Sequence, residues 1–378
     1  MRMFLFGTIA FLIYFGACFY TGKRLLDLVR FFYPNIKALL FYLPYAFLCL
    51  CFVLTNFFRY NLHFLRLAGS LWMTILLYFL MLLAVSEAVR LCLFLAGEKI
   101  PNFNLYTAGT ALIICVLFNI YGIINAHSVK TVDYNLTLRG TGSDMRIVLV
   151  SDTHIGSNIG KSHIKRIADK INRAQGDIVL IAGDLFDGNI DYIKDLEGLI
   201  SVLRTINAPL GVYACLGNHD VDMVSFSGSK TERIEEIIKR AGFVLLQDEV
   251  HKIRDNLYLA GRRDARPIGM NAERKPAGEL LSSLAGTIIV LDHQPTEFSQ
   301  IEKAGADLLL CGHTHRGQLF PSTLITREIF KRAGSVYYGY WQGQTMQAVV
   351  TSGAGFWGPP VRIGTNSEVV VINVNFTP

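Results

Sequence analysis

The chain has 378 residues, of which 51% are hydrophobic and 17% are charged, with a formal net charge of +6. This composition is too apolar for one ordinary soluble domain and too charged for a pure membrane bundle, so the apolar residues must be concentrated in one part of the chain. The positive charge is modest and spread along the sequence, which predicts no nucleic-acid partner.

Four apolar runs of membrane-spanning length lie in the first 127 residues, at about 3–20, 38–58, 67–89 and 105–126. Each run is close to the roughly 20 residues that a helix needs to cross about 30 Å of hydrocarbon. The first run lacks a small-x-small cleavage site and three more spans follow, so we interpret it as a retained helix and not as a signal peptide. Residues 1–127 are therefore predicted to be an all-α, four-helix transmembrane region of a multi-pass protein of the cell membrane.

Four spans place both termini on one side of the membrane, and the distribution of Lys and Arg predicts which side. The basic residues in or beside the first and third connections are Lys23, Arg24, Arg30, Lys37, Arg90 and Lys99, and those on the opposite side are Arg2, Arg59, Arg66, Lys130 and Arg139. This distribution favours cytoplasmic first and third connections, so the C-terminal domain is expected to be extracytoplasmic.

Polar residues inside the spans are few. Glu87 and Arg90 are expected to pair at a helix end, and Asn119 and Asn125 to hydrogen-bond across helices. No charged path crosses the bilayer, which favours an anchor over a transporter.

Residues 128–378 alternate short apolar runs with amphipathic stretches, which predicts an α/β domain. The predicted strands are "RIVLVSD", "DIVLIAGD", "GVYACLGNHD", "TIIVLDH" and "DLLLCGHTH", and the predicted helices are "KSHIKRIADKINRAQ", "YIKDLEGLISVLRTI" and "KTERIEEIIKRAG". Two further strands, "QAVVTSG" and "EVVVINV", follow without intervening helices and suggest a second, partly antiparallel sheet.

Metal-ligating residue types recur where these strands end. They are Asp152, His154, Asp184, Asn218, His219, His293, His313 and His315. Because ligands gather at the carboxyl ends of strands in open α/β sheets, these residues are candidates for one site. Oxygen and imidazole ligands without a thiolate suit Mn, Fe or Zn and argue against a closed structural zinc site. Eight residues are too many for one ion, but they suit two ions bridged by a carboxylate, an arrangement used in phosphoester hydrolysis.

Five blocks in chain order, "SDTH", "AGD", "GNHD", "LDHQP" and "CGHTH", resemble the motifs of the calcineurin-like metallophosphoesterases. The continuation "GHTHRGQ" and the segment "VVTSGAGFWGPPVRIG" are most similar to a bacterial, membrane-anchored branch, although that branch more often has Gly where Arg316 stands. The resemblance covers only residues 128–378, for which it implies a four-layer αββα sandwich.

The resemblance also implies roles for individual residues. Asp152, His154 and His315 would bind one metal ion, Asn218, His293 and His313 the other, and Asp184 would bridge the two. His219 would not be a ligand but would protonate the leaving oxygen or stabilise the transferring phosphoryl group, with Asp220 orienting it. Two divalent ions are expected, with Mn favoured and Fe or Zn as alternatives.

Other residues have weaker assignments. Arg362 and Arg316 are candidates for substrate binding, since an Arg side chain can bind a phosphate in a bidentate manner. Asp187 and Asp222 are interpreted as supporting or turn residues, and His163 and His251 as ordinary helix or surface residues.

The segment "REIFKRAGSVYYGYWQGQ" mixes basic and aromatic residues. That composition suits a membrane interface, a wall over a phosphorylated substrate or an ordinary surface with aromatics packed on the core.

The predicted function is a membrane-anchored phosphoesterase that hydrolyses a phosphodiester, pyrophosphate or phosphomonoester bond by attack of a metal-bound hydroxide. The bilayer and a phosphorylated, lipid-linked or envelope substrate are the expected partners. Three alternatives stay open: a tethered phosphodiesterase of a soluble, nucleotide-type substrate, a non-catalytic metal-binding scaffold, and a transporter with a regulatory domain. The sequence identifies no protein partner.

Overall fold

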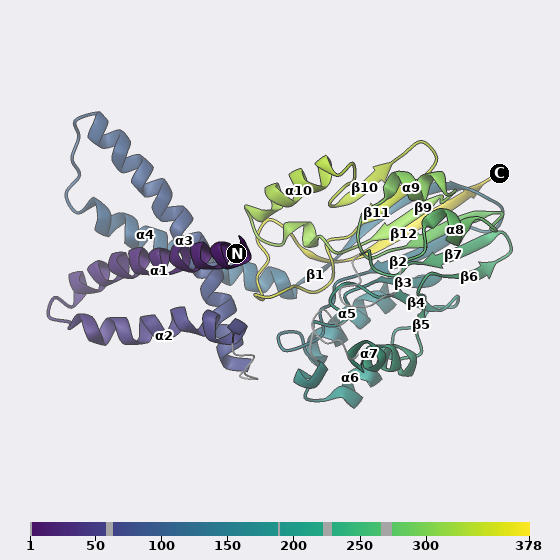
Figure 1. Ribbon diagram of the computed structural model, residues 1–378, viewed down its shortest axis with the longest axis horizontal. Helices are drawn as coiled ribbons and strands as arrows, with labels where there is room; N and C mark the ends of the chain where they lie inside the picture. The colour runs from purple at the N-terminus through teal and green to yellow at the C-terminus, as the bar shows by residue number, and fades with distance from the viewer. Residues whose placement is uncertain (1, 58–62, 188–189, 222–228, 266–273) are drawn as a thin grey trace. The chain divides into compact units, whose positions relative to one another are not determined.

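The computed structural model describes residues 2–57, 63–187, 190–221, 229–265 and 274–378 (Figure 1). The chain divides into two compact units, one made of residues 1–123 and 358–361 and the other of residues 124–357 and 362–378. Asp222, with its predicted turn or supporting role, lies outside the described residues.

Long helices make up the first unit. They are α1 (Arg2–Phe32), α2 (Ala38–Phe57), α3 (His63–Leu95) and α4 (Phe103–His127), and α4 continues into the second unit. All four are long and apolar enough to cross a membrane. Helix α1 extends through Lys23, Arg24 and Arg30, which were expected in a connection, because Lys, Arg and Leu are good helix formers that continue a helix beyond its apolar run.

The predicted pair of Glu87 and Arg90 is confirmed, with 2.5 Å between Arg90 Nη2 and Glu87 Oε2. The same carboxylate also pairs with Arg24, which is buried, and accepts a hydrogen bond of 2.9 Å from the Tyr20 hydroxyl. Glu87 is therefore compensated by two cations, one from its own helix and one from α1.

The two predicted interhelical amides have different partners. Asn119 Oδ1 accepts a hydrogen bond of 2.6 Å from the Thr74 hydroxyl, so α3 and α4 are linked as expected. The Asn125 side chain instead donates to the carbonyl oxygens of Arg362 (3.1 Å) and Thr365 (2.6 Å). The expectation that Asn125 links two helices is therefore wrong, because two loop carbonyls take up its amide group.

Two six-stranded mixed sheets form the centre of the second unit. The first has the order β1 (Val129–Arg139), β12 (Ser367–Thr377), β2 (Met145–Val150), β3 (Ile178–Ala182), β4 (Val212–Cys215) and β5 (Val244–Leu245). The second has the order β10 (Gly339–Gln342), β11 (Gln347–Val350), β9 (Leu308–Cys311), β8 (Thr287–Leu291), β7 (Leu257–Gly261) and β6 (Glu249–Arg254). Strands β2 to β5 are parallel to one another, as are β7, β8, β9 and β11.

The last strand does not join the second sheet, where it was expected. Strand β12 lies in the first sheet, antiparallel to β2 and parallel to β1, and its register with β1 runs from Val129–Ser367 to Arg139–Thr377. The second sheet is still partly antiparallel, through the pairs β10–β11 and β6–β7.

Helices cover the outer face of each sheet, which gives four layers (Figure 1). On the first sheet they are α5 (Lys161–Arg173), α6 (Leu196–Leu203) and α7 (Ser229–Arg240), and on the second they are α8 (Ala277–Leu281) and α9 (Phe298–Lys303). A separate apolar cluster fills the space between the sheets. Because the central strands have both faces covered, they are continuous apolar runs such as "IVLIA" in β3. The four-layer αββα sandwich is thereby confirmed.

Candidate metal centre

The strand ends that were predicted to form a site turn sharply. Five candidate ligands have a positive φ: Asp152 (53°), His154 (44°), Asp184 (51°), His313 (73°) and His315 (48°). This left-handed conformation costs a residue with a Cβ of the order of 1 kcal/mol or more, and such strain clusters at functional sites. The turns direct side chains from several strands toward one region.

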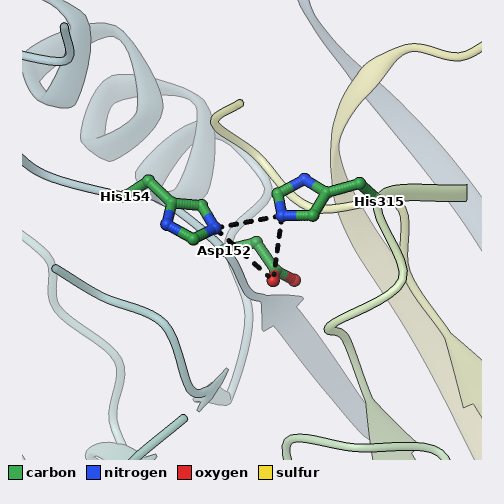
Figure 2. A group of neighbouring side chains, drawn as sticks. All are labelled: Asp152, His154 and His315. Carbon is green, nitrogen blue, oxygen red and sulfur yellow. Dashed lines mark hydrogen bonds and ion pairs between the residues drawn. The ribbon is translucent and has the colours of Figure 1, made fainter. Parts of the chain in front are cut away.

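The first group of ligands consists of Asp152, His154 and His315, whose side chains point toward one another (Figure 2). The Nε2 atoms of the two histidines are 3.0 Å apart, and Asp152 Oδ1 lies 3.4 Å from His315 Nε2 and 3.9 Å from His154 Nε2. All three residues are buried. Within the described residues, Asp152 Oδ1 has no hydrogen-bond partner. A buried carboxylate oxygen without a donor is costly, and a cation at this position would compensate it.

The second group consists of Asn218, His293 and His313 beside Asp184. His293 Nε2 lies 3.2 Å from Asn218 Oδ1 and 3.1 Å from His313 Nδ1. His293 Nδ1 is 2.9 Å from the carbonyl oxygen of Ala182, so Nδ1 carries the proton and the lone pair of Nε2 faces the other ligands. A metal-binding histidine commonly has its second ring nitrogen fixed by a backbone carbonyl in this manner.

Asp184 faces both groups. Its Oδ2 atom lies 3.2 Å from His293 Nε2 and 3.7 Å from His154 Nε2, while Oδ1 accepts a hydrogen bond of 2.8 Å from the backbone N–H of His219. This position is the one that a bridging carboxylate requires.

Glycines allow the chain to pass close to the ligands. A Cβ atom on Gly312 would lie 1.8 Å from Ser151 Oγ and 2.4 Å from Asp152 Oδ2, and one on Gly217 would lie 2.2 Å from Asp184 Oδ1. Any side chain at these two positions would therefore displace a candidate ligand.

The electrostatics favour metal binding in the first group. Burial lowers the pKa of both His154 and His315, so these imidazoles stay neutral, the form that binds a metal ion. Burial also raises the pKa of Asp152, since its negative charge is poorly solvated. A divalent cation would favour the ionised carboxylate there.

His219 lies at the edge of the centre, with 23% of its side chain exposed. Its Nδ1 atom is 3.4 Å from Asp187 Oδ1, and its ring centroid is 5.0 Å from that of His154. Burial lowers the pKa of His219, but the hydrogen bond and charge of Asp187, together with the charge of Asp184, outweigh burial and raise that pKa. The protonated form of this partly exposed imidazole is thereby favoured, which suits a proton donor.

Asp220 does not have the orienting role predicted for it. Its carboxylate is fully buried and accepts hydrogen bonds from the backbone N–H groups of Leu185 (3.2 Å), Phe186 (2.8 Å) and Gly217 (2.9 Å). Asp220 therefore links the turn that follows β3 to the turn that follows β4 through hydrogen bonds. The carboxylate that lies beside the His219 ring is that of Asp187.

Arg362 is not placed to bind substrate either. Its fully buried guanidinium donates to the carbonyl oxygens of Ser352 (2.6 Å), Gly355 (2.8 and 3.0 Å) and His315 (3.3 Å), and to the Thr365 hydroxyl (3.3 Å). It also lies 3.2 Å from His315 Nδ1. Because protein acceptors surround this guanidinium, Arg362 supports the loop behind His315 and leaves no face open to a phosphate.

Two further side chains, Arg316 and Trp357, lie beside His315 in the chain and beside the ring of His219, respectively. Arg316 places its guanidinium 4.3 Å from the ring centroid of Tyr338, and its role in substrate binding stays a prediction. Trp357, to which the sequence assigned no role, is 54% exposed, and its ring centroid lies 5.9 Å from that of His219. Gln318 holds the Trp357 backbone through two hydrogen bonds, of 2.9 and 2.8 Å. The motifs "THRGQ" and "GFWGPP" contained this pair, but only the fold brings them together.

Comparisons with known proteins show which family this chain is similar to. The model of the calcineurin-like phosphoesterase family matches residues 145–317. A metallophosphoesterase of Campylobacter jejuni is 30% identical over 302 residues, covering 76% of this chain and 76% of its own length. A "transmembrane protein with metallophosphoesterase domain" of Danio rerio is 30% identical over 297 residues, covering 73% of this chain and 64% of its own. A solved 5′-nucleotidase precursor from Thermus thermophilus aligns with a TM-score of 0.35 and 16% identity over 61% of this chain and 55% of its own.

Proposed function

The chain belongs to the calcineurin-like metallophosphoesterase family, and from that premise we propose that it is a membrane-anchored phosphoesterase with two divalent metal ions. The proposed reaction is hydrolysis of a phosphodiester, pyrophosphate or phosphomonoester bond in a lipid-linked or envelope substrate.

The observation that carries this proposal is the position of Asp184 between two groups of ligands. When bound, two divalent ions supply the nucleophile and neutralise charge on the phosphoryl oxygens. The residues fit such ions, because imidazole nitrogens and carboxylate oxygens converge there and one buried oxygen, Asp152 Oδ1, needs a partner. The donor set suits Mn²⁺, Fe or Zn²⁺, and we expect Mn²⁺ because the oxygen ligands are hard donors.

His219 would donate the proton that the leaving oxygen needs. Asp187 raises the pKa of His219 and so favours its protonated form, and the partial exposure of His219 lets a substrate reach the ring. Trp357, beside His219, would contact the leaving group. The orientation with the catalytic domain outside the cytoplasm remains part of this proposal.

Hydrolysis of p-nitrophenyl phosphate and bis-p-nitrophenyl phosphate by the full chain in detergent, with added Mn²⁺, tests the activity. We expect metal-dependent turnover that falls at least about 100-fold in His219→Ala, the usual contribution of a general acid. Asp184→Asn should lose both turnover and bound metal. His251→Ala is the matched control, because His251 lies exposed on β6 and should leave turnover unchanged.

Two outcomes would overturn the proposal. Two bound ions per chain without turnover of these compounds or of a lipid extract would indicate a metal-binding scaffold. Absence of bound metal would refute the centre itself. If the enzyme is active but hydrolyses a nucleotide faster than any lipid-linked phosphate, the substrate is a soluble one and not a lipid.

A further inference from the structure

Helix α10 (Ser322–Arg332) follows the metal centre in the chain and buries none of its residues. Three apolar side chains on it are largely exposed, namely Leu324 (56%), Ile325 (60%) and Ile329 (58%). Phe320, just before the helix, is 42% exposed. Exposed apolar side chains that lie together mark interaction sites, whereas single ones are common on any protein surface.

Basic residues accompany this apolar surface. A shallow groove on the helix is lined by Leu324, Ile325, Ile329, Glu328 and Arg332. Arg327 and Lys331 are also exposed, so α10 carries three cations and one anion. An apolar face bordered by Lys and Arg is typical of helices that lie in the interface of an anionic bilayer.

The aromatic residues of the segment "REIFKRAGSVYYGYWQGQ" mostly pack within the domain. The ring of Trp341 packs 5.0 Å from that of Phe298 over the second sheet, and the Tyr338 hydroxyl donates to Glu368 Oε2 (3.1 Å). These aromatics therefore belong to the fold of the α/β unit. Tyr340 is 42% exposed, but the adjacent exposed aliphatic side chains lie on α10, which begins at Ser322, before this segment.

We propose that Phe320, Leu324, Ile325 and Ile329, with the cations of α10 around them, form a docking surface that lies in the headgroup region of an anionic bilayer. A bilayer is the favoured occupant because the same chain carries four helices long and apolar enough to cross one. Such a tether keeps the local concentration of lipid high, so a surface of only a few side chains suffices. The proposal does not depend on hydrolysis.

A short stretch of chain connects the docking surface to the metal centre. The turn η2 (His315–Gly317) contains His315 and leads into α10. A Cβ on Gly317 would lie 2.6 Å from Thr323 Cα, so the first turn of the helix rests directly on η2. Insertion of α10 would hold this end of the metal centre at the level of lipid headgroups.

Fluorescence quenching in nanodiscs tests the proposal with the full chain. Of the seven cysteines, all in the described part of the chain, Cys92 is the exposed one, so Cys92→Ser provides the background. An environment-sensitive dye on Ile325→Cys should be quenched by nitroxides placed near the headgroups of discs that contain phosphatidylglycerol. The matched control is the dye on Lys165→Cys, on an exposed position of α5, which should stay unquenched.

A charge-reversed variant adds a second readout in the same labelled chain. Arg327→Glu with Lys331→Glu and Arg332→Glu leaves Phe320, Leu324 and Ile329 in place and should reduce quenching several-fold. Reversal of the charges of Lys165, Lys170 and Arg173 on α5 should leave the quenching unchanged.

Absence of quenching at Ile325, or equal quenching in neutral and anionic discs, would overturn the proposal. A blue shift that depends on protein concentration in lipid-free detergent would also overturn it, because a second copy would then cover the surface.

Discussion

Two aspartates near His219 carry the same charge but contact different groups. Asp187 is 28% exposed and faces His219 Nδ1, whereas Asp220 is fully buried and holds three backbone N–H groups. Only the first can influence protonation of His219 by direct contact. The second determines whether two ligand-bearing turns keep their positions.

Substitution of these two residues should therefore have different effects. Asp187→Asn should lower kcat at neutral pH by about 10-fold, because His219 loses the partner that keeps it protonated, while metal content and melting temperature stay unchanged. Asp220→Asn should lower stability by about 1–3 kcal/mol, because an amide offers one acceptor oxygen where a carboxylate offers two. Measurements of kcat report the effect on His219, metal analysis reports the ligands, and thermal unfolding reports stability. The assignment is wrong if Asp220→Asn alone reduces kcat without changing stability.

Arg362 is expected to act through stability and not through substrate affinity. Arg362→Lys replaces a planar group with five donors by a single ammonium, so several buried carbonyl groups would lose their donors. We expect a loss of about 2–4 kcal/mol in thermal unfolding and a KM within about twofold of the unsubstituted chain. A tenfold higher KM at an unchanged melting temperature would instead support the substrate-binding role inferred from the sequence.

These residues mark the limit of prediction at this scale. Asp152, His154, Asp184 and the other candidate ligands were identifiable for two reasons. Few types of side chain bind metal ions, and these residues follow directly on predicted strands, where ligands gather in α/β sheets. Neither the contacts of Asp220 nor those of Arg362 could be predicted in this manner. Their partners are backbone groups of loops distant in sequence, and a motif contains no information on which buried carbonyl or N–H lacks a partner.

At the scale of elements, α5 buries a histidine together with its isoleucines. His163 is 4% exposed, its Nδ1 lies 3.0 Å from Arg166 Nη2, and its ring packs 5.3 Å from that of His127. Burial first, and then the charges of Arg166 and His127, lower the pKa of His163 from 6.5 to about 4. The neutral ring is thus part of the packing between α5 and the end of α4.

This lowered pKa predicts a pH dependence of stability. Between about pH 6.5 and 4 the unfolded chain binds a proton at His163 that the folded chain does not, so stability falls as pH falls, by up to about 1.4 kcal/mol per pH unit. Melting temperatures at pH 7 and pH 5 should differ less in His163→Leu than in the unsubstituted chain. His251→Leu, on exposed β6, should retain the full difference. Equal differences in all three proteins would exclude this role for His163.

Local sequence patterns were sufficient for elements whose neighbours are near in sequence. Helix α5 and the apolar strand β3 were predictable because periodicity and burial are local properties. The pairing of β1 with β12 was not predictable, since these strands are separated by most of the domain and β1 alternates polar and apolar residues like many surface strands. The sheet that β12 joins was consequently assigned incorrectly.

At the scale of the whole molecule, orientation in the membrane rests on few charges. Arg24 was counted among the basic residues of the first connection, but it is buried against Glu87 and is thus compensated. Arg90 pairs with the same carboxylate. Long domains translocate largely regardless of charge, so Lys130 and Arg139 at the start of the large domain carry little weight. Lys23, Arg30, Lys37 and Lys99 then outnumber Arg2, Arg59 and Arg66, which still favours the cytoplasm for the connections after α1 and α3. Both termini, and with them the α/β unit, would then lie outside the cytoplasm.

Reporters fused after Pro378 test this orientation. A disulfide-dependent alkaline phosphatase folds only outside the cytoplasm, so we expect it to be active there, whereas a fluorescent protein that needs the cytoplasm should stay dark. The same reporters inserted after Lys37, between α1 and α2, should give the reverse result and so control for expression. Fluorescence after Pro378 with inactive phosphatase would place the metal centre in the cytoplasm. The anionic surface available to α10 would then be the cytoplasmic leaflet, and the substrate would have to be presented from that side.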